Sequence, residues 1–422
     1  MTLHSLESGA LPVTGSPWTS RLIPCFVGIL LTLLICADTV AQFGGGGGFG
    51  GRREFKPKIQ DGDRVALIGG TFIEREQQYG YFELALNLAL PETNFTLRNL
   101  GWSGDTVTGI SRARFGNQQE AWSHLTKSLD LVNPTIIFVA YGTNEAFRGQ
   151  EGLEEFKANY TKLLDELEKR TKRIVLIKPL PMENLGPPLP NPEEYNANVE
   201  LYGEAIKQLA YDRGHSTMGM NDAFSKYKPT LKSEPEHLTD NGMHLTEFGY
   251  WYLAPKMVES VAPWTWFNEV PRKAVAANPL KPHDKVFVRL PYPPAPGEEA
   301  PKSIQFAIHF YQEGKAILKG TGDSPDVEAT TEQWGRGVDI PATAIYAKTK
   351  QLHQAILRKN QLFFDRFRPQ NETYLYLFRK HEQGNNAVEI PQFDPLIEEQ
   401  DKKIFELKQP VTFDVKFEEA AK

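Results

Sequence analysis

The sequence predicts a three-layer α/β fold built on a parallel sheet, and three observations support this prediction. Short apolar runs alternate with amphipathic segments between residues 61 and 262. The apolar runs have the length and composition of buried strands, whereas the segments between them have helical periodicity. Polar, glycine-containing clusters follow several of the apolar runs, where ligands bind in a parallel sheet.

Four strands and four helices are expected in this region. The strands are expected at Arg64–Ile68, Phe95–Leu100, Thr135–Val139 and Arg173–Ile177. The helices are expected at Tyr81–Leu88, Gln118–Leu131, Leu153–Leu167 and Glu194–Tyr211, the last of them after the final strand. Such an alternation places helices on both faces of a parallel sheet.

Residues 263–422 differ in character and are expected to form a β-rich and helical C-terminal region. Strands are expected at Val286–Leu290, Ser303–Phe310 and Lys315–Leu318, and helices at Ala344–Phe364 and Asp394–Leu407. The region is either an insertion or an appended domain, and its helices could return to the α/β core.

The N-terminal residues 1–41 are expected to be a cleaved signal peptide. Arg21 precedes a fifteen-residue, mainly apolar run, and Thr39 and Ala41 supply small side chains before a cleavage point at Gln42. The apolar run is shorter than the ~20 residues of a membrane span. We therefore expect export to the periplasm, cell envelope or exterior, with no membrane span in the mature chain. An uncleaved anchor and a misplaced start are the alternatives.

The net charge and the positions of histidine and cysteine indicate which partners and cofactors the chain is not expected to bind. Residues 42–60 include a glycine tract and are expected to be a flexible linker. The net charge of −6 gives no general case for a nucleic-acid partner, and the nine histidines include no pair at metal-ligand spacing. Cys25 and Cys36 both lie in the leader, so the mature chain has neither a disulfide nor a cysteine nucleophile. We expect no metal or cofactor, and the oligomeric state is not indicated.

Four short clusters carry the chemistry of the α/β region. They are Ile68–Thr71, Asn99–Asp105, Tyr141–Glu145 and Asp240–His244. Their order and context resemble the SGNH (GDSL-type) hydrolases, which cleave esters with a Ser-His-Asp apparatus. The resemblance covers roughly residues 61–262 and implies a flavodoxin-like, three-layer hydrolase fold.

The resemblance implies a nucleophile and an oxyanion hole. Thr71 stands where the family has its nucleophilic serine, and Gly70 replaces the neighbouring aspartate. A threonine keeps the hydroxyl, but its methyl group restricts χ1. The backbone N–H groups of Thr71 and Gly104 and the amide of Asn144 would hold the oxyanion. Alternatively, Thr71 only caps the helix that follows it.

The resemblance also implies that His244 is the general base. The family has an aspartate three residues before this histidine, where this chain has Asn241, and Asp240 lies one residue earlier. Either side chain could orient His244, and the sequence does not choose between them.

Taken together, these residues predict an exported hydrolase of ester bonds. Its substrates would be acyl or acetyl esters, with carbohydrate esters favoured, and lysophospholipids or thioesters are alternatives. The competing class is a catalytically silent carbohydrate- or envelope-binding protein. That class would explain why Thr71, Gly70 and Asn241 all depart from the family pattern.

Overall fold

The computed structural model describes residues 58–113, 116–230, 233–259, 261–262, 274–275, 285–322, 324–369 and 389–419. The predicted signal peptide, nearly all of the predicted linker and the chain just after residue 262 lie outside these ranges. Export, cleavage and the division into domains at residue 262 therefore stay predictions.

A five-stranded parallel sheet forms the centre of the α/β part. Its order is β2-β1-β3-β4-β5, with strands β1 (Asp63–Gly69), β2 (Phe95–Asn99), β3 (Ile136–Ala140), β4 (Ile174–Ile177) and β5 (Ser216–Met218). The predicted parallel α/β fold is confirmed, as are the four predicted strands to within two residues. The prediction that the helix near residue 200 follows the last strand is wrong, because β5 comes after it.

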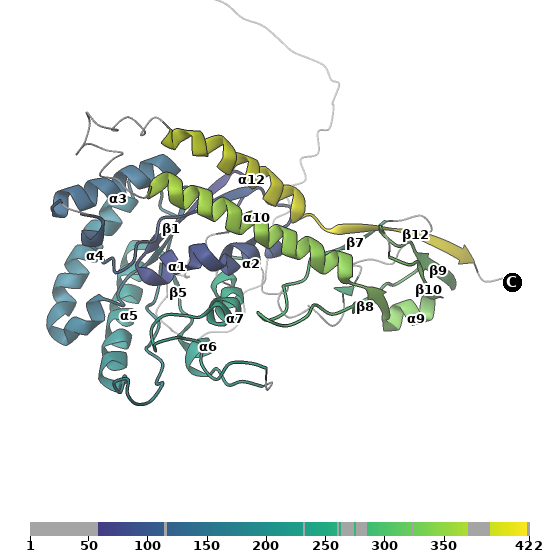
Figure 1. Cartoon of the computed structure of the whole chain (residues 1–422), viewed down its shortest axis with the longest axis horizontal. Helices are drawn as coiled ribbons and strands as arrows, with labels where there is room; N and C mark the ends of the chain where they lie inside the picture. Colours follow the sequence, from purple (N-terminus) through teal and green to yellow (C-terminus); the bar gives the residue numbers. More distant parts are fainter. Residues whose placement is uncertain are drawn as a thin grey trace, which may run out of the picture. The chain divides into compact units, whose positions relative to one another are not determined.

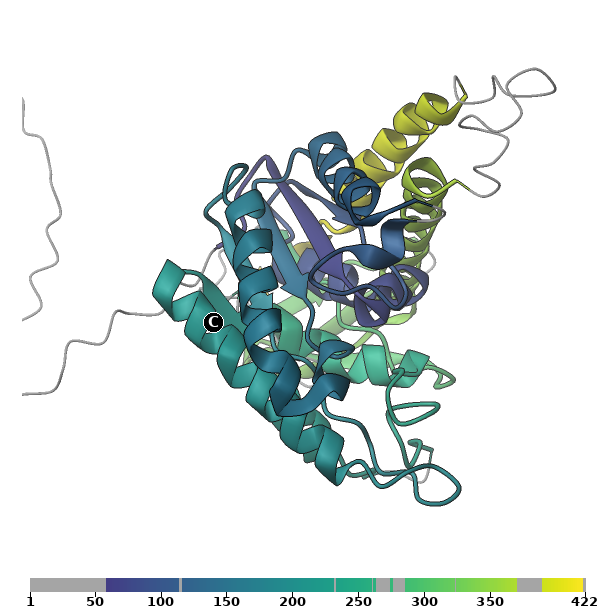
Figure 2. The same ribbon diagram turned by 90° about the vertical axis from the view of Figure 1, so that its left-hand side faces the viewer.

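Helices cover both faces of this sheet, because alternate residues of each strand face opposite sides. On one face, Val65 and Leu67 of β1 pack with α1 (Thr71–Tyr79), α2 (Tyr81–Ala89) and α7 (Glu247–Val258). On the other face, Ala66 and Ile68 pack with α3 (Gln118–Val132), α4 (Leu153–Leu167) and α5 (Glu193–Arg213). Figure 2 shows α4 and α5 in front of the sheet. Shorter helices are η1 (Ile110–Ala113), η2 (Glu145–Gly152) and α6 (Asn221–Ser225).

The predicted β-rich C-terminal region forms two small sheets (Figure 1). One is antiparallel in the order β10-β9-β12-β7, and the other has the order β11-β8-β6. The strands are β6 (Ala274–Val275), β7 (Lys285–Val288), β8 (Ser303–Ala307), β9 (Gly314–Leu318), β10 (Val327–Thr330), β11 (Val338–Pro341) and β12 (Val411–Glu419). Two short helices, α9 (Thr331–Arg336) and η4 (Ile390–Gln392), complete the region.

The two long C-terminal helices, α10 (Thr343–Phe367) and α12 (Phe393–Leu407), lie side by side (Figure 1). α10 packs against α1, α2 and β2 of the α/β part. Its Lys359 ammonium is fully buried and donates to both carboxylate oxygens of Glu83, at 2.8 and 2.6 Å, and to the carbonyl of Leu97 at 2.8 Å. The C-terminal helices therefore belong to the packing of the α/β core.

Candidate active site

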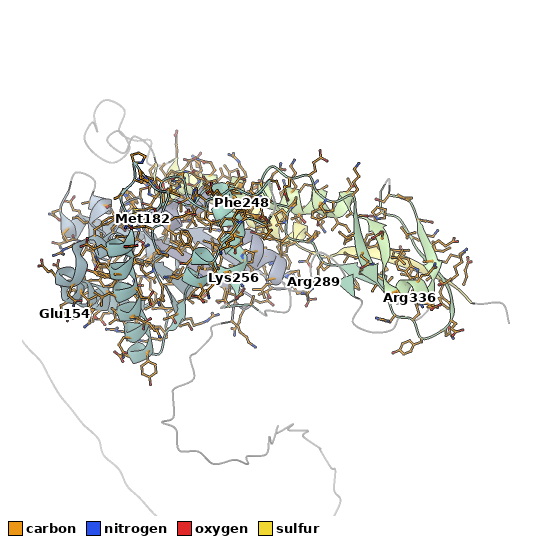
Figure 3. The ribbon with its side chains drawn as sticks, turned by 90° about the horizontal axis from the view of Figure 1, so that it is seen from below. Glu154, Met182, Phe248, Lys256, Arg289 and Arg336 are labelled. Carbon is orange, nitrogen blue, oxygen red and sulfur yellow. The ribbon has the colours of Figure 1, made fainter. Side chains whose placement is uncertain are left out.

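The four sequence clusters meet at a pocket beyond the carboxyl ends of the parallel strands. The pocket brings together Thr71 after β1, Asn144 after β3 and His244 from the loop before α7. Its cavity volume is about 60 Å³. Its apolar wall comes mainly from the segment that follows β4: Pro179, Leu180, Pro181 and Met182, the last labelled in Figure 3.

Thr71 is the first residue of α1, and its backbone N–H therefore has no acceptor within the helix. Its hydroxyl oxygen accepts a hydrogen bond of 3.0 Å from the N–H of Gly104. Gly70 is the N-cap and offers no side chain to the helix. A Cβ on Gly70 would lie 3.2 Å from the carbonyl oxygen of Asp105. The missing side chain thus lets the Asp105 loop pack closely beside the nucleophile position.

The loop that carries Gly104 is fixed against α1. Gly101 packs so closely that a Cβ there would lie 2.3 Å from the backbone nitrogen of Glu74. The buried Asn99 side chain accepts from the N–H of Gly101 at 2.8 Å and donates to the carbonyl of Ile73 at 2.6 Å. Gly104 itself has φ = +69°, a left-handed conformation that favours glycine. These contacts place the Gly104 N–H over the start of α1.

A buried ion pair lies beneath the same loop. Arg112 Nε donates to Asp105 Oδ2 at 2.7 Å, and the Tyr141 hydroxyl donates to the same oxygen at 3.0 Å. Arg112 also donates to the carbonyl of Leu100 at 2.8 Å. Burial and the charge of Asp105 raise the pKa of Tyr141 far above its ordinary value. Tyr141 therefore stays protonated and acts as a donor that holds the loop.

Asn144 and Glu145 connect this loop to the end of β3. Asn144 Nδ2 donates to the carbonyl of Asp105 at 2.9 Å, which leaves its second amide hydrogen for a ligand. The Glu145 carboxylate accepts from the N–H of Val107 at 2.8 Å and from that of Gly142 at 3.0 Å. Burial raises the pKa of Glu145. Glu145 therefore bridges the loop that carries Gly104 and the loop that carries Asn144.

The side chain that contacts His244 is Asn241. Asn241 Oδ1 accepts from the N–H groups of Met243 and His244, at 3.1 and 2.8 Å, so its Nδ2 is the atom that faces His244 Nδ1 at 3.1 Å. An amide nitrogen can only donate, so Nδ1 is the acceptor and the neutral ring carries its proton on Nε2. Asp240 forms an ion pair with Arg75 at 3.0 Å. Neither Asp240 nor Asn241 lines the pocket.

Glu183 anchors the histidine loop from the segment after β4. Its carboxylate accepts from the N–H of Leu238, the N–H of Thr239 and the Thr239 hydroxyl, the last at 2.6 Å. Its own N–H donates to the carbonyl of Gly242 at 2.7 Å. No local sequence pattern marks Glu183, whose partners lie more than fifty residues away, or Arg112, whose partners Asp105 and Leu100 are near in the chain but are joined to it by no recognisable motif. Asp105 and Glu145 lie inside the clusters, but their supporting contacts were not foreseen.

Across the ranges that the structure describes, no three His, Cys, Asp or Glu side chains gather in a way that could hold a metal ion. Within the same ranges, no helix is both long and apolar enough to cross a membrane.

Comparison with known families is consistent with this geometry. The GDSL-like lipase/acylhydrolase family matches residues 74–252. This part of the chain is an SGNH-type hydrolase domain. The matched range includes Gly104, Asn144 and His244 but begins after Thr71, so it does not bear on the nucleophile. No curated protein matches the sequence.

Solved structures extend the likeness of this SGNH-type hydrolase. BT4096, a gut microbial diltiazem-metabolizing enzyme, aligns over 87% of this chain and 99% of its own, with 15% identity and a TM-score of 0.58. At that identity the likeness shows the fold, including the C-terminal region. Axe2, an acetylxylan esterase from Geobacillus stearothermophilus, aligns over 48% of this chain and 95% of its own, with 21% identity and a TM-score of 0.38.

Proposed function

We propose that this exported SGNH-type protein hydrolyses short-chain esters, with Thr71 as nucleophile and His244 as general base. One observation carries the proposal. The Thr71 hydroxyl, the Asn144 amide and the His244 ring line one small pocket, and the N–H of Gly104 contacts the Thr71 oxygen. A nucleophile, a base and oxyanion donors are the parts that acyl transfer requires.

The reaction would proceed in two halves. Thr71 Oγ1 attacks the ester carbonyl carbon while its proton passes to His244 Nε2. The carbonyl oxygen becomes an oxyanion held by the N–H groups of Thr71 and Gly104 and by Asn144 Nδ2. The intermediate then expels the alcohol, which takes the proton from His244, and leaves an acyl-threonine. A water molecule deprotonated by His244 attacks this acyl-enzyme, and the resulting intermediate releases the acid as Thr71 Oγ1 takes the proton back from His244.

The size of the pocket favours a short acyl group. A cavity of about 60 Å³ accommodates a group of acetyl size, whereas a fatty acyl chain would extend into solvent. We therefore favour acetyl esters, including those of carbohydrates, over lysophospholipids. Thioesters of the same short acids would fit equally well. The predicted signal peptide supports an extracytoplasmic substrate.

A second candidate function is binding without turnover, and the contact between Asn241 and His244 favours it. With its proton on Nε2, the resting imidazole presents a donor to the pocket and cannot accept the proton of Thr71. Hydrolysis would then need the Asn241 side chain or Asp240 to rearrange. A silent protein would instead use the Nε2 proton to bind the carbonyl or hydroxyl of a ligand.

The deciding experiment is hydrolysis of ethyl acetate and of an acetylated xylo-oligosaccharide by the purified protein. Wild type is compared with Thr71→Ala, Thr71→Ser and His244→Ala, and with Thr126→Ala on α3 as a control. The proposal expects activity in wild type and the control, and its loss in both site alanine variants. If wild type is inactive but Thr71→Ser is active, binding becomes the better assignment. If Thr71→Ala keeps full activity, Thr71 is not the nucleophile.

A further inference from the structure

Phe147 is a large aromatic side chain that stays 59% exposed beside the pocket. It lies on η2, three residues after Asn144. Its ring packs against that of Tyr195 in a tilted arrangement, with centroids 4.4 Å apart and planes inclined by 33°. Tyr195 is buried and lines the pocket. The Phe147 ring thus continues the pocket wall into solvent.

The ring pair is held in a fixed position relative to the oxyanion donors. The Tyr195 hydroxyl donates to the carbonyl of Thr143 at 2.9 Å, directly before Asn144. The next residue, Asn196, accepts from the N–H of Met182 at 2.7 Å and donates to its carbonyl at 2.8 Å. These bonds tie the ring pair both to the oxyanion loop and to the apolar pocket wall.

Polar groups border the exposed ring. Asn198 lies three residues after Tyr195 and therefore on the same face of α5. Its half-buried amide makes no hydrogen bond to any residue that the structure describes, and it lies next to Gly149 of η2. Arg148, also on η2, forms an exposed ion pair of 2.7 Å with Glu155 of α4. The surface is thus one aromatic face with a hydrogen-bonding rim.

An isolated ring with a polar rim suits some ligands better than others. Among the exposed aromatic side chains in the described ranges, Phe147 alone has a ring contact with a pocket residue; Tyr211, Phe287 and Tyr311 do not. A lipid surface or acyl chain would need a broader apolar patch. A pyranose ring has an apolar face of C–H groups and a rim of hydroxyls, and so matches both features.

We propose that Phe147 and Tyr195 form a platform for a sugar ring that carries the scissile ester. The Asn198 amide would form a hydrogen bond to an oxygen substituent of that ring. The inference rests on the proposed function, because a cavity of about 60 Å³ holds the acyl group and leaves the alcohol part of the substrate outside. That alcohol part must then lie against the mouth, where the platform stands.

The test compares kcat and KM for xylose tetraacetate, which has the ring, and ethyl acetate, which has none. Phe147→Ala is expected to raise KM for the sugar ester at least fivefold and to leave kcat/KM for ethyl acetate within twofold. Phe147→Trp, which keeps an aromatic face, should retain the wild-type KM. Phe287→Ala on β7 is the matched control, since Phe287 is also a largely exposed phenylalanine. This variant should change kcat and KM for neither substrate.

The outcomes separate this inference from the proposed function. Equal KM values for the sugar ester in wild type and Phe147→Ala overturn the platform. An equal loss of kcat/KM for the sugar ester and for ethyl acetate overturns it as well. If Phe147→Ala loses more kcat/KM with phenyl acetate than with xylose tetraacetate, the sugar assignment is overturned. If wild type cleaves no ester, the proposed function fails, and calorimetric binding of xylose tetraacetate to wild type and Phe147→Ala still decides the platform. Weaker binding by the variant supports it, and unchanged or undetectable binding overturns it.

Discussion

The side-chain amide of Asn241 donates a hydrogen bond to Nδ1 of His244 over 3.1 Å. In a serine hydrolase this position holds an acceptor, which keeps a proton on Nδ1 and frees Nε2 to act as base. Here the amide oxygen is already bonded to two backbone N–H groups, so turning it to accept from the ring would break both of those hydrogen bonds. The contact therefore works against the tautomer that hydrolysis needs.

Replacing Asn241 with aspartate should reverse this effect. A carboxylate can accept both from the backbone N–H groups and from Nδ1–H, and so restores a basic Nε2. Loss of such a carboxylate lowers kcat about 10⁴-fold in a serine protease, so we expect Asn241→Asp to raise kcat for ethyl acetate at least ~10-fold. Long-range ¹⁵N–¹H spectra of His244 would follow the proton from Nε2 to Nδ1. Unchanged spectra and unchanged kcat would contradict the tautomer argument.

Removing Asp240 should have little effect on turnover. Asp240 pairs with Arg75, and its carboxylate is 45% exposed, so the pair contributes at most ~1 kcal/mol to stability. We expect Asp240→Ala and Arg75→Gln each to keep kcat/KM within about threefold, as measured with ethyl acetate. If Asp240→Ala is as inactive as His244→Ala while Arg75→Gln is not, Asp240 moves to His244 during turnover, and Asn241 is not its partner.

Truncating Glu145 should damage the oxyanion hole from a distance. Glu145→Ala leaves the buried N–H groups of Val107 and Gly142 without their acceptor, at a cost of ~1–3 kcal/mol each. The loops of Gly104 and Asn144 would loosen, so we expect kcat to fall ~10-fold or more with a smaller change in KM. Glu145→Gln keeps one acceptor oxygen, so its kcat should lie between those of wild type and Glu145→Ala. Wild-type kcat in Glu145→Ala would show that the loops hold without this bridge.

Local patterns predicted most of the sheet and the long helices. α4 (Leu153–Leu167) was predicted to the residue, because its apolar positions recur with helical spacing. β5 (Ser216–Met218) was missed because three residues with two hydroxyl side chains carry no strand pattern. α1 (Thr71–Tyr79) was not marked as a separate element, since its buried face includes Glu76 and Gln77. A helix with carboxyl and amide side chains on its buried face does not show the usual apolar periodicity.

The same distinction applies to the site. Thr71, Asn144 and His244 were predicted from their clusters, and the structure brings them to one pocket. The sequence left Asp240 and Asn241 as alternatives, because which one reaches His244 depends on the conformation of a short loop. Glu183 shapes that loop from more than fifty residues away. Long-range side-chain to backbone hydrogen bonds of this kind leave no spacing signal.

The carboxyl group of Glu76 should make the free energy of unfolding depend on pH at values above the ordinary pKa of a glutamate. It is buried, one oxygen accepts from the N–H of Phe82 at 2.7 Å, and the other has no hydrogen-bond partner among the residues that the structure describes. Burial, with the nearby Glu83, raises the pKa of Glu76 to about 8 from an ordinary 4.5. Between these values the folded protein keeps a proton that the unfolded chain has lost. The free energy of unfolding should therefore fall with rising pH, by up to ~1.4 kcal/mol per unit.

Glu76→Gln should remove this dependence, because the amide still accepts from Phe82 N–H but does not titrate. Denaturant unfolding at pH 5, 6, 7 and 8 would measure the slope. We expect a flatter slope than in wild type, and an unchanged slope in Glu120→Gln, a matched control on the exposed start of α3. Equal slopes in wild type and Glu76→Gln would mean that the carboxyl is ionised in the fold at pH 7.

Substitutions at Lys359 should test whether α10 unfolds together with the SGNH-type domain. Lys359→Met leaves the carboxylate of Glu83 buried and unpaired, which should cost ~3–5 kcal/mol of unfolding free energy. The double variant Lys359→Met with Glu83→Leu should recover much of this loss, because no charge then remains buried. Lys350→Met, at an exposed site on α10, should change stability by less than ~0.5 kcal/mol. Guanidinium unfolding followed by circular dichroism would measure all three. A Lys359→Met protein as stable as Lys350→Met would contradict the ion pair. A single destabilised transition for the whole chain would show that α10 and the five-stranded parallel sheet form one cooperative unit.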